Sequence, residues 1–221
     1  MTILFVLLTF LVIMTITYYA RRGQQPAVQP SVAVNNVAAP RMVRDFGFEI
    51  PKGYCFHPGH TWVLDEGRQI ARVGLDSFAA NLVGKIDRIE VTGLNRWVRQ
   101  GQKVWSITRD NVTIDMVAPV EGVVTAVNPE VQKDPSLLTK DPYKDGWVCV
   151  IKSPDLAFNV NNLLRGSFVG AWMQNTLRRV GTLLPQTAGA MAQDGGIPVA
   201  GVLTQVDSNV QRTMIKEFFL T

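Results

Sequence analysis

The side chains best suited to chemistry are few in this chain of 221 residues. Its two histidines lie within one turn, His57–His60, and such a pair could begin a metal site. Zinc sites need three or four ligands, and no third ligand stands beside the pair at metal-site spacing. Cys55 and Cys149 form no C-x-x-C motif, and Cys149 lies within an apolar run. We therefore expect two reduced thiols and no metal site.

Carboxylates and nucleophiles give no stronger indication of catalysis. The acidic groups Asp65-Glu66 and Asp141–Asp145 fall in turn-like sequences, where solvated acids are usual. Neither a G-x-S-x-G motif nor a P-loop occurs. Because no set of nucleophile, base and oxyanion donors is visible, we expect no catalytic residues, no small-molecule substrate and a protein that is not an enzyme.

The net charge of +4 is unevenly distributed along the chain. Residues 1–44 contribute +4, residues 45–155 contribute −2, and residues 156–221 contribute +2. A nucleic-acid-binding domain needs a basic surface, and the central region is mildly acidic. We therefore expect no nucleic-acid partner.

The histidines, cysteines and acidic residues named above fall in a region whose sequence predicts short β-strands. Apolar runs punctuated by glycine turns between Phe46 and Ser153 predict a mainly β domain over residues 45–155, of the barrel or sandwich type. The polar stretch Thr108–Thr113 between two apolar runs predicts a hairpin. The expected strands lie near 60–64, 69–74, 85–91, 97–98, 104–107, 114–117, 122–127 and 147–151, with a short helix near 75–82.

Several short sequence motifs in this region resemble those of the H protein of the glycine cleavage system, a relative of lipoyl domains. They are His60-Thr-Trp-Val, Ala71–Ala80, Leu82–Ile86, Ala118–Val124, Asp134–Leu138 and Asp141–Trp147, in the order and spacing of that family. The resemblance covers about residues 57–155. It implies a barrel-sandwich hybrid fold, in which two small sheets carry a protruding hairpin.

The resemblance also implies a functional position at the tip of that hairpin. In the family a lysine there forms an amide with lipoic acid, and the lipoyl arm moves between enzymes. The family spacing places this lysine at Asn111, whose side-chain amide cannot be acylated in that way. No lysine lies between Lys103 and Lys133, so a shifted register does not supply one. We therefore expect a carrier fold without a cofactor.

The N-terminus has the pattern of a membrane anchor, predicted over residues 1–22. Thr2–Tyr19 contains no charge, proline or glycine, and as a helix it would rise about 27 Å, close to the ~30 Å hydrocarbon core. A cleaved signal peptide fits less well, because no basic region precedes the run and no small-x-small site precedes Arg21. A buried soluble helix is the other alternative. The anchor residues are Leu4, Phe5, Leu8, Phe10, Ile13, Tyr18, Tyr19, Arg21 and Arg22.

The charges flanking this segment predict its orientation. Arg21 and Arg22 follow the apolar run and no charge precedes it, so the positive-inside rule places the N-terminus outside and the rest in the cytoplasm. We expect a single-pass protein of a bacterial-type inner membrane. Residues 23–44 are predicted to be a linker rich in Pro, Ala, Val and Gln, extended rather than folded.

The C-terminal extension, residues 156–221, is predicted to contain helices near 167–180 and 208–220. Gly181 is expected to close the first helix. Both helices have apolar rows, which either pack on the protein's own domain or dock on a partner. The candidate protein-interface residues are Phe168, Trp172, Val210, Met214, Phe218 and Phe219.

These features together predict a non-catalytic, membrane-anchored scaffold. Its H-like domain and C-terminal tails would bridge other subunits of a membrane complex, photosynthetic or respiratory, on the cytoplasmic face. The expected partners are therefore protein subunits and the lipid bilayer. The alternative is a pseudo-carrier, which regulates lipoate-dependent enzymes by docking to them without being lipoylated.

Overall fold

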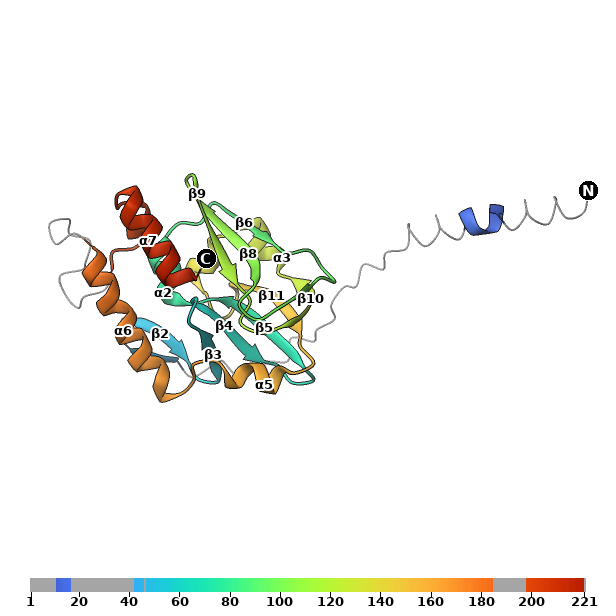
Figure 1. Ribbon diagram of the computed structural model, residues 1–221, viewed down its shortest axis with the longest axis horizontal. Coiled ribbons are helices and arrows are strands. Elements are labelled where there is room, and N and C mark those ends of the chain that lie inside the picture. Colours follow the sequence, from blue (N-terminus) through green and yellow to red (C-terminus); the bar gives the residue numbers. More distant parts are fainter. Residues whose placement is uncertain (1–10, 17–41, 46, 185–197, 221) are drawn as a thin grey trace, which may run out of the picture. The chain divides into compact units, whose positions relative to one another are not determined.

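The computed structural model describes residues 11–16, 42–45, 47–184 and 198–220 (Figure 1). The chain divides into two compact units, Met1–Val37 and Ala38–Thr221. In the first unit, residues 11–16 are helical, and Thr15 Oγ1 donates a hydrogen bond of 2.9 Å to the Val12 carbonyl. Within the described ranges, no helix combines the length and apolar character that crossing a membrane requires. Of the predicted anchor residues, all except Ile13 lie outside the described part of the chain.

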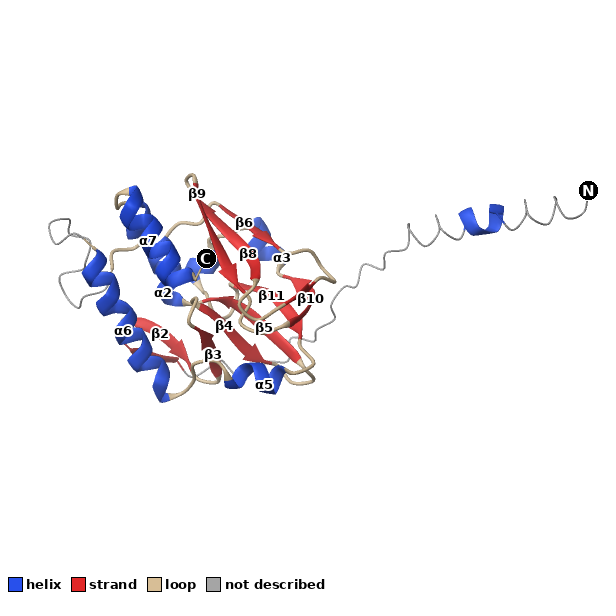
Figure 2. Ribbon diagram, in the orientation of Figure 1, coloured by secondary structure: helices blue, strands red, loops and turns tan. Residues whose placement is uncertain are grey.

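The second unit is built on a six-stranded antiparallel sheet (Figure 2). Its spatial order is β3-β4-β5-β11-β10-β7, so strands from the beginning and the end of the domain pair at its centre. Central strands β5 and β11 each have four buried residues out of six, whereas β7 has two residues and lies at the edge. The strands are β3 (Tyr54–His57), β4 (Thr61–Asp65), β5 (Ile70–Leu75), β7 (Trp97–Val98), β10 (Gly122–Val127) and β11 (Trp147–Lys152).

Two smaller sheets complete the β structure. A three-stranded sheet has the order β6-β8-β9, and its strands are β6 (Arg88–Val91), β8 (Lys103–Arg109) and β9 (Val112–Val117). A two-stranded ribbon pairs β1 (Met42–Asp45) with β2 (Phe48–Pro51). Strand β1 overlaps the last three residues, 42–44, of the segment predicted to be a linker, and the strand depends on backbone pairing with β2.

Polar side-chain caps mark the beginnings of some of the helices. Asp76 Oδ1 accepts the Ala79 N–H at the start of α2, and Asp207 Oδ1 accepts the N–H groups of Asn209 and Val210 at the start of α7. The helices are α2 (Ser77–Val83), α3 (Pro129–Lys133), α4 (Leu137–Lys140), α5 (Leu156–Asn161), α6 (Ser167–Leu183) and α7 (Ser208–Phe219), with a 3₁₀ turn η1 (Val202–Thr204).

Helix α6 continues past Gly181, which was predicted to end it. Glycine costs about 1 kcal/mol in a helix interior, and tertiary packing can offset that cost. Val180 and Leu184 on either side are buried, so the last turn is held by the core. The predicted helices near 167–180 and 208–220 are otherwise confirmed, as are the mainly β domain and the hairpin at Thr108–Thr113.

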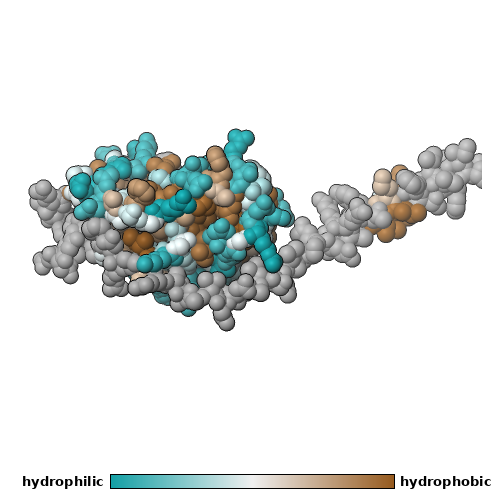
Figure 3. All heavy atoms as spheres, turned by 90° about the horizontal axis from the view of Figure 1, so that it is seen from below, coloured by the Kyte–Doolittle hydropathy of each residue, from teal (hydrophilic) through white to brown (hydrophobic). Residues whose placement is uncertain are grey.

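The core has two parts. The larger part joins both main sheets, α2 and the C-terminal helices, and includes Leu75, Trp105, Met173 and Phe218. The smaller part is aromatic and centres on Trp62, whose Nε1 donates to the carbonyls of Leu75 (2.8 Å) and Pro142 (3.1 Å). Seen from below, the surface is a mosaic of polar and apolar side chains, with apolar ones gathered near its middle (Figure 3).

Candidate functional site: the hairpin and the segments packed against it

The β8–β9 hairpin ends in a two-residue turn made of Asp110 and Asn111. Arg109 pairs with Val112 across the hairpin, and Asp110 has a positive φ of 51°. Both turn residues are exposed, and Asn111 therefore lies at the tip as the sequence predicted. The Asp110 N–H donates to Asp87 Oδ2 at 2.8 Å, and this hydrogen bond, together with Lys85, lowers the pKa of Asp87.

The Arg109 side chain fastens the hairpin to the body of the domain. Its Nη1 donates to the Val83 carbonyl at the end of α2. A Cβ added to Gly84 would lie 2.7 Å from the same nitrogen, and one added to Gly201 would collide with the guanidinium group. The Gly201 N–H donates to the Asn81 carbonyl at 2.7 Å. The C-terminal extension, α2 and the hairpin therefore meet at a point where only glycine fits.

The hairpin offers no amine for a lipoyl group at its turn. Lys103, the nearest lysine along the chain, is the first residue of β8, and its Nζ pairs with Asp115 Oδ1 at 2.5 Å across the hairpin. The next lysine along the chain, Lys133, ends α3 and pairs with Glu130. The residues present at the turn thus do not fit a group attached through a lysine amide.

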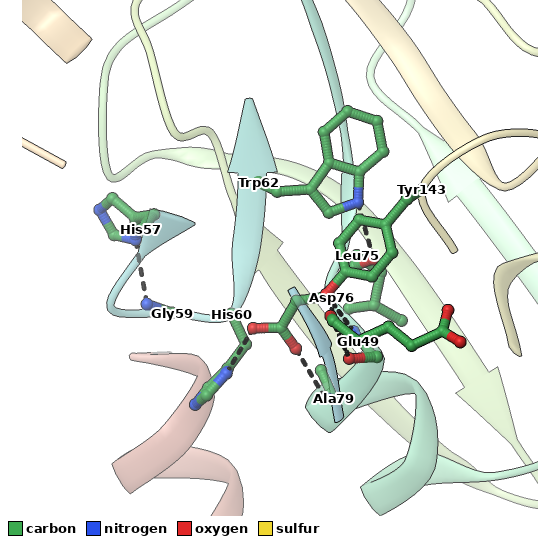
Figure 4. Close-up of polar contacts among 10 residues, drawn as sticks. Glu49, His57, Gly59, His60, Trp62, Leu75, Asp76, Ala79 and Tyr143 are labelled. Carbon is green, nitrogen blue, oxygen red and sulfur yellow. Dashed lines mark hydrogen bonds and ion pairs between the residues drawn. The ribbon is translucent and has the colours of Figure 1, made fainter. Parts of the chain in front are cut away.

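The turn between β3 and β4 carries the two histidines (Figure 4). His60 is 1% exposed, and its Nδ1 lies 2.7 Å from Asp76 Oδ2. Because Asp76 also caps α2, one buried carboxylate connects the turn to the helix. The His60 ring stacks on Trp172 of α6 at 4.7 Å and lies 4.4 Å from the Phe78 ring.

The C-terminal helices cover this turn. Phe218 of α7 meets the His60 ring edge-on at 6.3 Å, and Trp172 comes from α6. A Cβ added to Gly59 would lie 2.8 Å from Val117 Cγ2 in β9 and 3.4 Å from the Phe219 carbonyl oxygen. The turn is therefore enclosed between the hairpin and the end of α7.

His57 is a half-buried base whose ring accepts a hydrogen bond. Its Nδ1 accepts the Gly59 N–H at 3.0 Å. Burial, reinforced by the nearby His60, lowers the pKa of His57 from 6.5 to about 4. The described residues contain no group of three or more His, Cys, Asp or Glu placed to hold a metal ion.

His57 gives the domain an expected pH dependence. Its folded pKa lies below its unfolded value, so its contribution to stability is complete above pH 6.5 and is lost as the pH falls towards about 4. His57→Asn keeps an acceptor for the Gly59 N–H and removes the titration. The midpoint of urea unfolding, measured between these pH values, should fall less steeply for the variant than for the natural chain. Parallel pH profiles would contradict this assignment.

Tyrosine and cysteine groups near the site are held in their neutral forms. Tyr143 OH accepts the Ser77 N–H at 3.1 Å, and Tyr54 OH donates to the Tyr143 carbonyl at 2.9 Å. Burial raises the pKa of Tyr54 to about 12 and also raises the pKa of Tyr143. Both cysteines are free, and burial raises the pKa of Cys55 and of the fully enclosed Cys149.

The six predicted interface residues differ in how far their side chains are buried in the protein's own core. Met214, Phe218 and Phe219 are buried in the protein's own core, so their assignment to a partner surface was wrong. The apolar stripe of α7 faces the domain because Phe78, β9 and η1 supply apolar surface for it. The remaining three differ in exposure: Trp172 and Val210 are half-buried against the core, and Phe168 is 71% exposed.

The fastening of the hairpin by Arg109 was not predicted. Its partners, Val83, Gly84 and Gly201, come from distant parts of the sequence, and no local pattern links them. The glycine at position 201 was the one local signal, because its left-handed conformation, with φ 76°, favours that residue type. A glycine in a loop-like segment does not reveal which distant side chain lies against it, so the contact becomes visible only in the folded domain.

Comparison with known proteins agrees with this architecture. The family model for the glycine cleavage H-protein matches residues 54–175. A glycine cleavage system H protein of Thermus thermophilus is 32% identical over 108 residues, which are 49% of this chain and 84% of that protein. A probable glycine cleavage system H protein 2 of Sulfolobus acidocaldarius is 34% identical over 114 residues, which are 50% of this chain and 76% of that protein.

Solved structures include a glycine cleavage system H protein from Mycobacterium marinum. The two share 22% identity with a TM-score of 0.49, over 57% of this chain and 98% of that one. The family match begins at β3 and ends within α6, so α7 and the residues before β3 are additions to it. On the match over more than half of its length, this chain belongs to the glycine cleavage H-protein family.

Proposed function

We propose that this chain is a non-catalytic member of the H-protein family that carries no lipoyl group and binds other protein subunits while anchored in a membrane. The observation that carries the proposal is the turn of the β8–β9 hairpin, which holds Asp110 and Asn111 where a lipoyl carrier needs a lysine. Lipoic acid is attached through a primary amine, and the Asn111 amide is not one.

The attachment of the hairpin supports the same conclusion. A surface that binds other subunits gains from being rigid before the partner arrives, because less conformational entropy is lost on binding. Here Arg109 and Asp110 bond to Val83 and Asp87, and α7 packs against β9. A hairpin held in this way suits a fixed binding surface better than a shuttle.

The proposed membrane attachment rests on the sequence of the first 22 residues. An uncharged run from Thr2 to Tyr19, followed by Arg21 and Arg22, is typical of a single span with its C-terminal side in the cytoplasm. The proposal places the domain on that side, where it would bridge subunits of a multi-subunit membrane complex.

Intact-mass spectrometry of the chain purified from its native membrane tests the central claim. We expect the unmodified mass, whereas a lipoyl adduct on any lysine would overturn the proposal. Asn111→Lys, expressed beside a lipoate ligase, tests whether a lysine at this turn is recognised. Extraction in a mild detergent followed by native sizing should show the chain in a larger assembly, and a chain migrating alone would contradict the scaffold role.

Family membership favours one alternative. The relatives are named as glycine cleavage system H proteins, and a domain that keeps their fold without a lipoyl group could occupy their docking surfaces as a pseudo-carrier. Binding to a glycine decarboxylase or a lipoate ligase in a pull-down would favour this regulatory role. Co-purification of membrane subunits without those enzymes would favour the scaffold.

A further inference from the structure

The exposed apolar side chains of the domain are concentrated on two segments. Among the described residues between Met42 and Leu220, six large hydrophobic side chains are at least 40% exposed, and four of them lie in residues 92–102 and 156–168. Leu94 and Trp97 are 55% and 50% exposed, and Phe158 and Phe168 are each 71% exposed. Such a concentration differs from the scattered single residues that are usual on a protein surface.

The two segments are held side by side by hydrogen bonds. Gln100 Nε2 donates to the carbonyls of Pro119 (2.8 Å) and Asn159 (3.2 Å), and Asn162 Nδ2 lies 3.5 Å from Gln100 Oε1. Trp97 belongs to the edge strand β7, and Phe158 belongs to α5, which lies along the lower border of the domain in Figure 1. The face seen from below carries exposed apolar surface (Figure 3).

Exposed arginines accompany these apolar side chains. Arg96 and Arg99 flank Trp97, and Arg165 lies between Phe158 and Phe168. The sequence contains no acidic residue between Glu90 and Asp110 or between Asp155 and Asp194. Arg165 Nη2 donates to the neutral side chain of Asn161 at 3.2 Å, which leaves its charge uncompensated.

Two acidic residues lie at the margin of this surface. Asp155 precedes α5 and follows the exposed Lys152. Glu121 is half-buried, and its N–H lies 3.4 Å from Asn159 Oδ1. A third acid, the exposed Asp65, acts on the pKa of the Cys55 thiol, as Arg165 does. None of the three forms an ion pair with Arg96, Arg99 or Arg165 within the described part of the chain. The surface is therefore both apolar and positively charged.

We propose that this arginine–aromatic patch, made of Leu94, Trp97, Phe158 and Phe168 with Arg96, Arg99 and Arg165, lies on the surface of an anionic lipid bilayer. Aromatic side chains settle at the boundary between headgroups and acyl chains, and arginines bind lipid phosphates. The inference extends the membrane attachment of the proposed function: the N-terminal segment would hold the domain near the bilayer, and the patch would orient it there.

Charge complementarity favours an anionic lipid bilayer as the binding partner of the patch. A weak apolar contact combined with several cations favours anionic lipid, since each arginine near such a surface strengthens binding about five-fold. Salt screens this attraction. Binding should therefore weaken as the ionic strength is raised from about 0.1 M, where the Debye length is about 10 Å, to about 1 M, where it is about 3 Å.

Amide hydrogen exchange of the full chain in phosphatidylcholine vesicles, with and without phosphatidylglycerol, tests the patch. We expect several-fold slower exchange in residues 92–102 and 156–168 only when phosphatidylglycerol is present, and loss of this protection at high salt. Brominated lipids should quench Trp97, and the quenched component should be missing in Trp97→Phe.

A matched pair of variants separates the patch from general charge effects. Arg96, Arg99 and Arg165 changed together to Gln should abolish the lipid-dependent protection. The same change at Lys85, Arg88 and Lys133, which are exposed on other segments, should leave it intact. Equal protection in both kinds of vesicle, equal effects of the two triple variants, or protection produced only by a co-purified protein would overturn the proposal.

The anchor is tested independently by alkaline carbonate extraction of the same vesicles. A chain that resists extraction but shows no lipid-dependent protection retains the anchor and refutes the patch. A chain that is extracted, yet whose two segments are protected by phosphatidylglycerol, supports the patch and refutes the anchor.

Discussion

Asp76→Ala is expected to lower the free energy of unfolding by about 2–4 kcal/mol, because it leaves the buried His60 ring nitrogen without its hydrogen-bond partner and also removes a helix cap. Asp76 is fully buried, and its Oδ2 lies 2.7 Å from His60 Nδ1. The cap removed is the N-cap of α2, which by itself is worth about 1 kcal/mol. Urea unfolding of the full chain in mild detergent, followed by tryptophan fluorescence, measures the loss.

Two further variants separate the causes of that loss. Asp76→Asn keeps a capping oxygen for the Ala79 N–H and a neutral hydrogen bond to His60, so it should lose clearly less stability than Asp76→Ala. Glu90→Ala removes an acid from an exposed pair with Arg88 and should cost no more than about 1 kcal/mol. If Asp76→Ala costs no more than Glu90→Ala, the buried pair does not stabilise the fold.

Phe218→Ala is expected to destabilise the domain by about 3–5 kcal/mol, the usual cost of removing a buried aromatic ring. Phe218 is 2% exposed and packs edge-on against Phe78 at 5.8 Å. The Arg179 guanidinium lies 5.7 Å from the centre of its ring and pairs with Glu217 of the same helix as Phe218. Loss of the ring should therefore loosen α7 from both α2 and α6.

Phe168→Ala is the matched control, because it removes the same side chain from an exposed position. Its effect on stability should stay within about 0.5 kcal/mol. Limited proteolysis should cut α7 faster in Phe218→Ala than in the natural chain, and Phe168→Ala should leave that rate unchanged. The opposite order would show that α7 is a docking helix in solution and not part of the core.

The β domain was predictable because its signals are local. Alternating apolar residues and glycine turns predicted strands such as β5 and β10, and the polar stretch between two apolar runs predicted the β8–β9 hairpin. The missing lysine could also be read directly from the chain, since it depends only on residue identity. Strand β1 was missed because its four residues show no alternation of apolar and polar side chains, and it exists through pairing with β2.

Local sequence patterns could not predict whether the C-terminal helices pack on the protein's own core or on a partner. The apolar stripe of α7 predicted a helix with one buried face, but the same stripe serves a partner or the protein's own core equally well. The answer depended on whether free apolar surface existed elsewhere in the chain, and Phe78 and β9 provide it. His60, which the sequence offered as a candidate ligand, is instead the buried contact between the barrel and both helices.

Residue types and their spacing therefore established the family, the strands, the hairpin and the absence of a lysine at its tip, because each is encoded within a few consecutive residues. The fastening of Arg109 beneath Gly201, the enclosure of His60 and the meeting of residues 92–102 with 156–168 were decided by tertiary packing. These contacts join residues far apart in the chain, and their free energy exists only when both sides are already folded.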